Sequence, residues 1–410
     1  MWLFDKFMSA IVKQGELTVV DWDGSTKVYG APSASHRPIT VRFTEKGAAD
    51  RLARSPRLGA GESYMDGRLT VDGDDILGLL DLVLGNATWE QGGIARGSLE
   101  KGGRKLMTKL DQWNSSRRSK QNVAHHYDLS DRLYDLFLDS DRQYSCAYFT
   151  DPSNSLEQAQ ADKKAHIAAK LYLKPGLRVL DIGCGWGGMA LYLNKVADVD
   201  VLGVTLSEEQ LKVARQRAAD AGVSDRVKFE LMDYRDLTGS FDRIVSVGMF
   251  EHVGVPQYEV FFRKTRDLLT PNGVMLLHTI GRLGEPGITD AWTAKYIFPG
   301  GYNPSLSQIV TASEKARMIV SDVETLRLHY AHTLDHWYAR TVAASDAIVR
   351  LYDERFLRMW KFYLAGAACG FRYGGICNYQ VQYIRQRSAL PITRDYIAEA
   401  EGTLRGLGLA

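Results

Sequence analysis

The chain has 410 residues, of which 45% are hydrophobic and 24% charged, values typical of a globular protein with two or three folded domains. Its 51 Lys and Arg and 49 Asp and Glu leave a net charge of +2, which excludes a polycation that binds nucleic acid over its whole surface. The four cysteines form no Cys-x-x-Cys pair, so we expect free thiols in a reducing compartment and no bound metal. Because no run of 18 apolar residues and no signal-peptide cleavage site is present, we expect a protein that neither spans a membrane nor is exported.

The first 90 residues predict a small α+β domain. Apolar residues at helical spacing indicate an N-terminal helix whose apolar side faces a core, which we favour, or a membrane surface: Phe4, Phe7, Met8 and Ile11. Residues 15–85 indicate short strands separated by Asp-Gly turns at 23–24, 66–67 and 72–73, followed by an apolar helix. This domain contains no recognisable catalytic motif, so we expect it to bind or to scaffold.

Residues 91–120 predict a basic linker. Between residues 96 and 120 there are eight Lys or Arg and two acidic residues, with Gly-Gly pairs inside and beside the stretch. Two interpretations are equally favoured, a solvated helix face and attraction to membrane phosphates. Nucleic acid is less favoured, because few aromatic residues are available for stacking on bases.

The remaining residues, 121–410, alternate between strand and helix patterns. Strands are predicted at residues 177–182, 199–205, 227–231, 243–247 and 274–279, with helices such as 207–221 and 256–269 between them. This alternation predicts a parallel, doubly wound α/β sheet. Residues 378–387 have strand character and predict an antiparallel strand at the edge of that sheet.

A glycine-rich loop follows the first of these strands. The stretch GCGWGG, residues 183–188, lies between a strand and a helix, where glycines let a ligand approach the backbone at a helix N-terminus. The pattern fits both a dinucleotide site and the loop of S-adenosylmethionine-dependent methyltransferases. Thr205 stands where a dinucleotide site needs an acidic residue, which weakens the nicotinamide interpretation. Asp181, just before the loop, is available for the amino group of adenosylmethionine.

Several ordered blocks of the sequence resemble one known family. They are YDLSDRLYDLFLD, RQYSCAYF, VLDIGCGWGG, GVTLSEEQ, DYRDL, FDRIVSVGMFEHVG, LLHTIG, IFPGG and HYAHTLDHWY. They are similar to the cyclopropane-fatty-acyl-phospholipid synthases and their mycolic acid relatives, and the N-terminal GESYMDGRLTVDG resembles the lipid-binding domain of the phospholipid enzymes. The resemblance implies a seven-stranded, mostly parallel, Rossmann-like methyltransferase sheet in a catalytic domain at 121–410, with a smaller lipid-binding domain at 1–90.

The same resemblance implies the reaction and its partners. A methylene group passes from S-adenosylmethionine to the cis double bond of an unsaturated acyl chain in a membrane phospholipid. A homodimer is implied, located in the cytoplasm on the inner face of the cytoplasmic membrane, with no nucleic acid partner. The residues that match the family's cofactor site are Tyr144, Ser145, Asp181, Gly183, Gly185, Gly187, Thr205, Leu206, Gln210, Asp233 and Tyr234.

Ring closure requires a base, for which the family uses bound bicarbonate. The matching residues are Cys146, Glu251, His278, Ile280 through its backbone, and Tyr330. Aromatic faces stabilise a carbocation, and the candidate wall residues are Phe149, Phe250, Tyr296, Tyr302 and Tyr338. One departure disfavours a covalent thiol, because Ala367 occupies the slot where some members carry a cysteine and Cys369 lies two positions later.

Three alternatives stay open. The same carbocation could give a methyl-branched, unsaturated or hydroxylated chain. The protein could be a lipid-binding scaffold with a vestigial cofactor site. An oxidoreductase is the third possibility.

Overall fold

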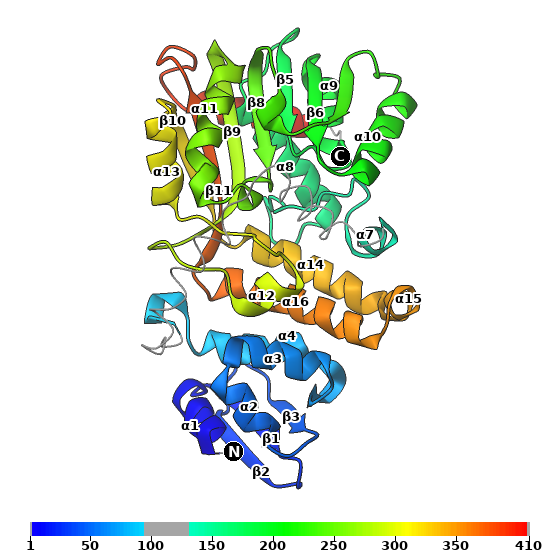
Figure 1. Ribbon diagram of the computed structural model, residues 1–410, viewed down its shortest axis with the longest axis vertical. Coiled ribbons are helices and arrows are strands. Elements are labelled where there is room, and N and C mark those ends of the chain that lie inside the picture. The colour runs from blue at the N-terminus through cyan, green and yellow to red at the C-terminus, as the bar shows by residue number, and fades with distance from the viewer. Residues whose placement is uncertain (1, 94–130, 408–410) are drawn as a thin grey trace. The chain divides into compact units, whose positions relative to one another are not determined.

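The computed structural model describes residues 2–93 and 131–407 (Figure 1). The basic stretch at 96–120 lies outside these residues. Within the described part of the chain, no helix has the length and apolar character needed to cross a membrane.

The described residues form two compact units whose limits differ from the expected boundaries near 90 and 120. The first unit contains residues 2–93, 289–299 and 331–375, and the second contains 131–288, 300–330 and 376–407. Two later stretches therefore belong to the N-terminal unit. A local sequence pattern does not show this, because it depends on packing between segments more than 200 positions apart.

The first unit has a four-stranded sheet in the order β2-β1-β3-β4. The strands are β1 (Gly15–Val20), β2 (Thr26–Ala31), β3 (Ile39–Phe43) and β4 (Leu69–Val71), and only the β1–β3 pair is parallel. Helix α1 (Trp2–Ile11) buries Phe4, Met8 and Ile11, which confirms the core-facing interpretation of the N-terminal helix. The apolar helix predicted after residue 75 is α4 (Ile76–Gly85).

The Asp-Gly turns were only partly predicted correctly. The pair at 23–24 joins β1 to β2 in a hairpin, with Gly24 at φ +84°. The other two do not make hairpins, because residues 48–65 form α2 (Ala48–Arg54) and α3 (Pro56–Met65) rather than strands. The pair at 66–67 follows the end of α3, and the pair at 72–73 leads from β4 toward α4.

Four further helices complete this unit, α12 (Ala291–Tyr296), most of α14 (His329–Ala343), α15 (Ser345–Leu351) and α16 (Glu354–Arg372). Helix α12 packs on α3, and α16 packs on α3 and α4. Trp292 donates from Nε1 to Met65 Sδ at 3.3 Å, and a side chain on Gly61 would collide with the Trp292 ring. These contacts explain why the later stretches fold with the N-terminal residues.

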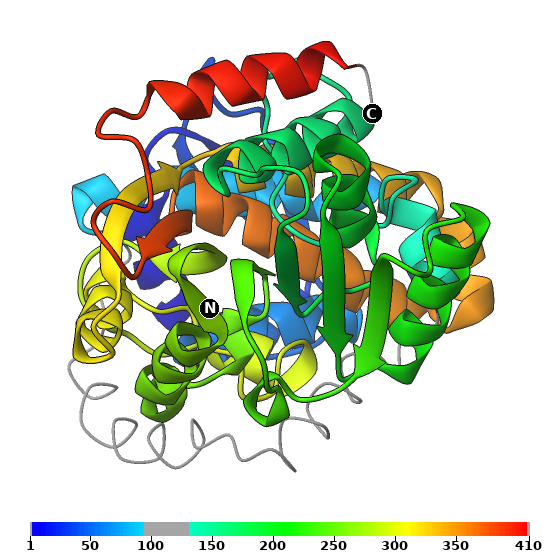
Figure 2. The same ribbon diagram turned by 90° about the horizontal axis from the view of Figure 1, so that it is seen from above.

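The second unit is built on a seven-stranded sheet in the order β10-β11-β9-β8-β5-β6-β7, which confirms the predicted fold class. Helices lie on both faces of the sheet (Figure 2). The strands are β5 (Arg178–Ile182), β6 (Asp200–Thr205), β7 (Val227–Leu231), β8 (Phe241–Val247), β9 (Leu269–Arg282), β10 (Ile319–Leu326) and β11 (Ile376–Ile384). The helices are α7 (Asp131–Phe137), α8 (Leu156–Lys170), α9 (Gly188–Ala197), α10 (Glu208–Asp220), α11 (Tyr258–Leu268), α13 (Leu306–Lys315) and α17 (Asp395–Gly406).

The prediction of an edge strand at 378–387 was wrong in its position. Strand β11 is antiparallel, but it lies between β9 and β10, and all of its residues after Ile376 are buried. The edge strand on this side of the sheet is β10, which the sequence pattern did not reveal. Buried and exposed residues do not alternate regularly along β10, because an edge strand has a neighbouring strand on one side only.

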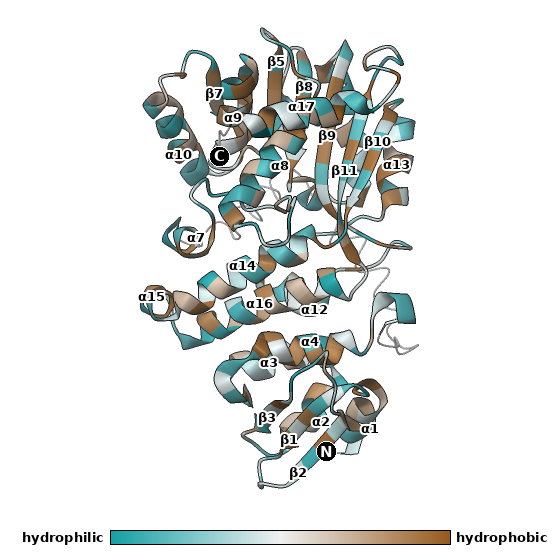
Figure 3. Ribbon diagram, turned by 180° about the vertical axis from the view of Figure 1, so that it is seen from behind, coloured by the Kyte–Doolittle hydropathy of each residue, from teal (hydrophilic) through white to brown (hydrophobic). Residues whose placement is uncertain are grey.

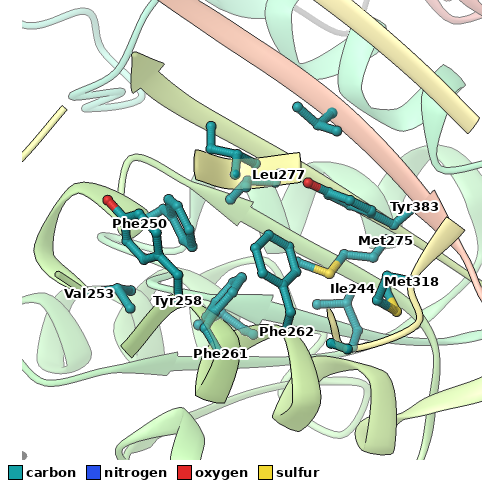
Figure 4. Close-up of a cluster of buried hydrophobic side chains, with 14 of the residues drawn as sticks. Ile244, Phe250, Val253, Tyr258, Phe261, Phe262, Met275, Leu277, Met318 and Tyr383 are labelled. Carbon is teal, nitrogen blue, oxygen red and sulfur yellow. The ribbon is translucent and has the colours of Figure 1, made fainter. Parts of the chain in front are cut away.

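Two apolar clusters pack the two faces of this sheet. One contains α11 and α13 residues, and in it Phe250 stacks on Tyr258 with ring centroids 4.3 Å apart (Figure 4). The other joins α8, α9 and α10 to β5, β6 and β7. The strands β5 and β7 are mostly hydrophobic in Figure 3, as expected where helices cover both faces of a sheet.

Candidate active site

The glycine loop leaves open space at one position only. Gly183, Gly185 and Gly187 all have positive φ, at +81°, +54° and +85°. A Cβ on Gly183 would lie 2.9 Å from Met249 Cβ, and one on Gly187 would lie 2.7 Å from the Phe229 ring. A Cβ on Gly185 would meet no atom of the described residues within 4 Å. The first and third glycines are therefore required by packing, whereas Gly185 leaves room for a ligand at the N-terminus of α9.

Asp181 is a buried carboxylate with capacity to bind a cation. It lies near the carboxyl end of β5 and is 2% exposed, and no group in residues 2–93 or 131–407 donates a hydrogen bond to its Oδ2. Burial raises the pKa of Asp181 to about 7, and the charge of Lys163 opposes this rise. An amino group placed beside this oxygen would satisfy it.

The predicted ribose residues meet after β6. Thr205 ends the strand, and its Oγ1 donates to Gln210 Oε1 at 2.9 Å. Ser207 caps α10 by accepting from the backbone N–H of Gln210, which fixes Gln210 in the first turn of that helix. Leu206 lies between them and is half-buried.

The predicted adenine residues follow β7. Asp233 is buried, and its two carboxylate oxygens accept from Arg235 at 2.6 to 3.0 Å. The Tyr234 ring contacts Phe261 edge-on, with centroids 5.4 Å apart. Arg235 thus already compensates the negative charge of Asp233, so the amino group of adenine would share the carboxylate of Asp233 with Arg235.

A strap of chain at residues 139–146 carries the two residues predicted for the methionine end. Tyr144 contacts Tyr134 and Phe137, and Tyr134 contacts Trp186 of the glycine loop, with centroids 5.1 Å apart. Ser145 Oγ accepts from Lys163 Nζ at 2.8 Å. This strap is tied to the loop by Arg217, which donates to Trp186 O at 2.9 Å and pairs with Asp141.

Glu251 is the carboxylate predicted to act in ring closure. It is 7% exposed, and its Oε1 accepts from the Ile280 backbone N–H at 2.5 Å, while its Oε2 has no hydrogen-bond partner in the part of the chain that the structure describes. Burial raises the pKa of Glu251 to about 7, and the bond from Ile280 opposes this rise. The segment that carries Glu251 also contacts the glycine loop, through Met249 and Gly183.

His278 is held inside the sheet. It is 1% exposed, with Nε2 3.1 Å from Asn378 Nδ2 and Nδ1 3.2 Å from Gln380 Nε2. A neutral imidazole donates through one nitrogen and accepts through the other, so one amide presents its oxygen to the ring. Burial, followed by the charges of Lys163 and Lys170, lowers the pKa of His278, which keeps the ring neutral.

Cys146 and Tyr330 belong to neighbouring segments. Cys146 is fully buried, its Sγ donates to Ala147 O at 3.3 Å, and burial raises the pKa of its thiol. Three residues later, the Phe149 backbone N–H donates to His329 Nδ1 at 2.9 Å, which brings the N-terminus of α14 and Tyr330 to this strap. Tyr330 itself is buried.

The aromatic candidates divide between the two units. Phe149, Phe250 and Tyr302 are buried in the second unit, while Tyr296 and Tyr338 belong to the first. Phe250 (Figure 4) and Tyr302 both belong to the apolar cluster packed by α11 and α13, which supports core packing for both. Cys369 is also in the first unit, and burial raises its thiol pKa to about 12, so it is not a nucleophile.

The sequence analysis missed three polar residues of this region. Lys163 is completely buried on α8, and Asn378 and Gln380 are buried on β11. The stretch NYQVQY carried a usable signal, because amides alternating with apolar residues in a strand place a polar row on one sheet face. For Lys163 no such signal exists, since α8 is rich in charged residues and reads as an exposed helix (Figure 3).

Comparison with solved structures defines the class. The chain is similar to a cyclopropane synthase of Mycobacterium tuberculosis, MmaA2, with 35% identity, a TM-score of 0.61, and coverage of 64% of this chain and 97% of that chain. It is also similar to the mycolic acid cyclopropane synthase CmaA1 complexed with SAH and CTAB, with 36% identity, a TM-score of 0.61, and coverage of 64% and 97%. With the sheet order and the glycine loop, these define an S-adenosylmethionine-dependent methyltransferase.

Sequence comparison defines the family. A family model described as mycolic acid cyclopropane synthetase matches residues 114–381, and one described as a domain of unknown function matches 3–88. A cyclopropane-fatty-acyl-phospholipid synthase of Escherichia coli is 41% identical over 350 residues, covering 85% of this chain and 88% of that protein. A probable fatty acid methyltransferase of Pseudomonas putida is 36% identical over 392 residues, covering 91% and 94%. The chain therefore belongs to the mycolic acid cyclopropane synthetase family.

Proposed function

We propose that the protein transfers a methylene group from S-adenosylmethionine to the cis double bond of an unsaturated acyl chain in a membrane phospholipid. The observation that carries this proposal is Glu251, a buried carboxylate with one fixed and one unpartnered oxygen, on a segment in contact with the cofactor loop. The name of the Escherichia coli relative supports the phospholipid substrate.

The chemistry explains the need for a buried site. The alkene attacks the methyl carbon of the sulfonium, the S–CH₃ bond breaks, and adenosylhomocysteine leaves while a carbocation remains on the acyl chain. Loss of a proton from the new methyl group then closes the ring. Water would capture the carbocation, so the site must be dry. In the second unit, Phe149 is the buried aromatic candidate that lies outside the apolar cluster around Phe250.

We further propose that bicarbonate, when bound, supplies the base for ring closure. The free Oε2 of Glu251 can accept a hydrogen bond from its OH group. Cys146, His278, Ile280 and Tyr330 are the other residues assigned to hold it. The Ile280 N–H and the His278 ring already have partners, so binding there requires that these bonds be exchanged.

A second product remains a candidate because of the names of two relatives. Besides the Pseudomonas putida protein, a tuberculostearic acid methyltransferase of Mycobacterium tuberculosis is 34% identical over 388 residues. If the carbocation loses a proton from the acyl chain instead, the product is a methyl-branched alkene of the same added mass.

We propose that the N-terminal residues 1–90 bring the enzyme to the bilayer. Large apolar side chains are exposed in this part of the first unit, among them Trp2 at 73%, Val28 at 53% and Trp22 at 48%. A homodimer that acts on the inner face of the cytoplasmic membrane completes the proposal.

The test is incubation of the full-length protein with labelled adenosylmethionine and vesicles of a monounsaturated phosphatidylglycerol and phosphatidylethanolamine. We expect adenosylhomocysteine and a lipid heavier by one CH₂ that resists catalytic hydrogenation under conditions that reduce alkenes. A product that takes up hydrogen would support the alternative. Absence of adenosylhomocysteine in the presence of lipid would contradict both.

A further inference from the structure

Lys163 lies at the junction of the strap and the glycine loop. It is 0% exposed, and its Nζ donates to Gln143 Oε1 at 2.6 Å and to Ser145 Oγ at 2.8 Å. Gln160, one turn earlier on α8, donates to the carbonyls of Gln143 and Ser145 at 3.1 Å each. One face of α8 therefore fixes the segment that carries the residues predicted for the methionine end of the cofactor.

Several charged and titratable groups surround Lys163, and they differ in whether another cation already compensates them. The titratable groups that face Lys163 come from three places. The strap contributes Asp139, Asp141 and Cys146, helix α8 itself contributes Lys164, and the sheet region contributes Asp181 and His278. Asp141 is already paired with Lys164 and Arg217. Among the described residues, Asp181 forms no ion pair and its Oδ2 accepts no hydrogen bond, so Lys163 is the positive charge there that acts on it.

We propose that Lys163 is a positioning residue for methyl transfer, which fixes Ser145 in the strap and supplies the positive charge that favours the ionised form of Asp181, so that this carboxylate can accept the amino group of the cofactor. This inference rests on the proposed cofactor site and adds a role that the family motifs do not assign. A neutral hydrogen-bonding residue at this position could also hold the strap, but it would lack the positive charge that favours the ionised form of Asp181.

The pH dependence of cofactor binding follows from this arrangement. The pKa of Asp181 is raised to about 7, so affinity should rise with pH as the carboxylate loses its proton. Cys184, the other titratable group facing Asp181, stays a neutral thiol because burial raises its pKa. Burial lowers the pKa of Lys163 to about 8, so its support for Asp181 fades in alkaline buffer. Without Lys163, the carboxylate should need a higher pH to ionise.

The experiment is calorimetric titration of the full-length protein with adenosylhomocysteine between about pH 5.5 and about pH 8.5. For Lys163→Met we expect affinity lower by roughly tenfold at pH 7 and a midpoint at higher pH than in the wild type. Lys163→Arg keeps the charge and should keep the wild-type midpoint even if its affinity falls. The matched control is Lys170→Met, which removes another buried lysine of α8, one paired with Glu324 and Asp322, and should leave the midpoint unchanged.

A wild-type affinity and midpoint in Lys163→Met would overturn the inference. If that variant does not fold, Lys163→Arg decides, since a shifted midpoint there would equally contradict a role for the charge. In Asp181→Asn the pH dependence near pH 7 should disappear, and its persistence would count against Asp181 as the titrating group. Failure of the wild type to bind adenosylhomocysteine at any pH would instead refute the proposed cofactor site.

Discussion

Glu251 combines a fixed oxygen and a free one in a buried position, and this geometry makes its removal informative. If its ionised form orients the proton acceptor, Glu251→Gln should slow turnover by a factor of roughly 10²–10⁴. Wild-type turnover should fall as pH decreases through about 7, the raised pKa of this group, because protonation removes the accepting oxygen. The measurement is the steady-state rate on vesicles against pH, in degassed buffer with and without bicarbonate. Unchanged adenosylhomocysteine affinity in the variant is the control, and a rate indifferent to bicarbonate would contradict its assigned role.

The buried charge of Glu251 should also lower the free energy of unfolding of the protein at neutral pH. The pKa of Glu251 rises from 4.5 in the unfolded chain to about 7 when folded, so the folded state binds the proton more tightly. The contribution of Glu251 to the free energy of unfolding is therefore greatest below pH 4.5. It falls by about 3 kcal/mol in total as the pH rises to about 7. Glu251→Gln keeps the acceptor for Ile280 and removes the buried charge, so it should raise the melting temperature at pH 8. A lower melting temperature would show that the charge is compensated.

Gly185 differs from its neighbours in having space rather than side chains beside it. Gly185→Val should abolish adenosylhomocysteine binding, because a branched side chain would occupy that space. Backbone strain is a separate effect, since Gly185 has φ +54°. Gly222→Val is the matched control, because Gly222 also has a positive φ and open space but lies in the turn after α10. Calorimetry should show lost binding only in the Gly185 variant, and equal loss in both would point to strain.

At the scale of elements, α1 presents two sides with different roles. Its buried side, Phe4, Met8 and Ile11, packs the first unit, whereas Trp2 is 73% exposed at its N-terminus. Trp2→Ser should therefore leave thermal stability and cofactor binding unchanged and reduce activity on vesicles several-fold, because an exposed indole anchors at the membrane interface. Ile392→Ser, which removes a fully exposed apolar residue from the second unit, is the control. Equal vesicle activity in wild type and Trp2→Ser would contradict a membrane role for this end of α1.

Packing of elements also decides how the N-terminal residues can be studied. Helix α16 packs on α3 and α4, and Trp292 of α12 rests against Gly61 and Met65. Removal of residues 1–90 would expose these apolar faces, so a truncated chain would test folding as much as function. Point substitutions in the full chain are the cleaner measurement.

At the scale of the whole molecule, the small net charge hides a strongly basic stretch. Eight Lys or Arg and two acidic residues lie between residues 96 and 120. Attraction to an anionic membrane is worth about 1 kcal/mol per basic residue, and salt screens it. Activity should therefore be higher on anionic than on zwitterionic vesicles and should fall with added salt. The difference should disappear when four of these residues are replaced by Gln: Lys101, Arg104, Lys105 and Lys109. Activity on detergent-dispersed lipid should stay unchanged in that variant. Equal activity on both kinds of vesicle would indicate a solvated helix face.

The sequence by itself determined the sheet and the cofactor loop. Strands β5 to β9 contain short apolar stretches flanked by helical patterns, a local signal that arises because helices cover both faces of a parallel sheet. Glycines at 183, 185 and 187 are equally local, since each needs a positive φ within one tight turn. The family motifs named Glu251, His278 and Asp181 because each lies in a short block of consecutive residues, FEHVG, LLHTIG and VLDIGCGWGG.

Only the tertiary structure decided which of these groups lack a partner and which do not. The unpartnered oxygens of Asp181 and Glu251, the amides of Asn378 and Gln380 on His278, and the burial of Lys163 depend on side chains that meet from distant segments. The same holds for the interior position of β11 and for the helices that join the N-terminal unit. Burial and charge compensation are properties of the packed chain, because each is set by what lies within a few ångströms in space rather than along the sequence.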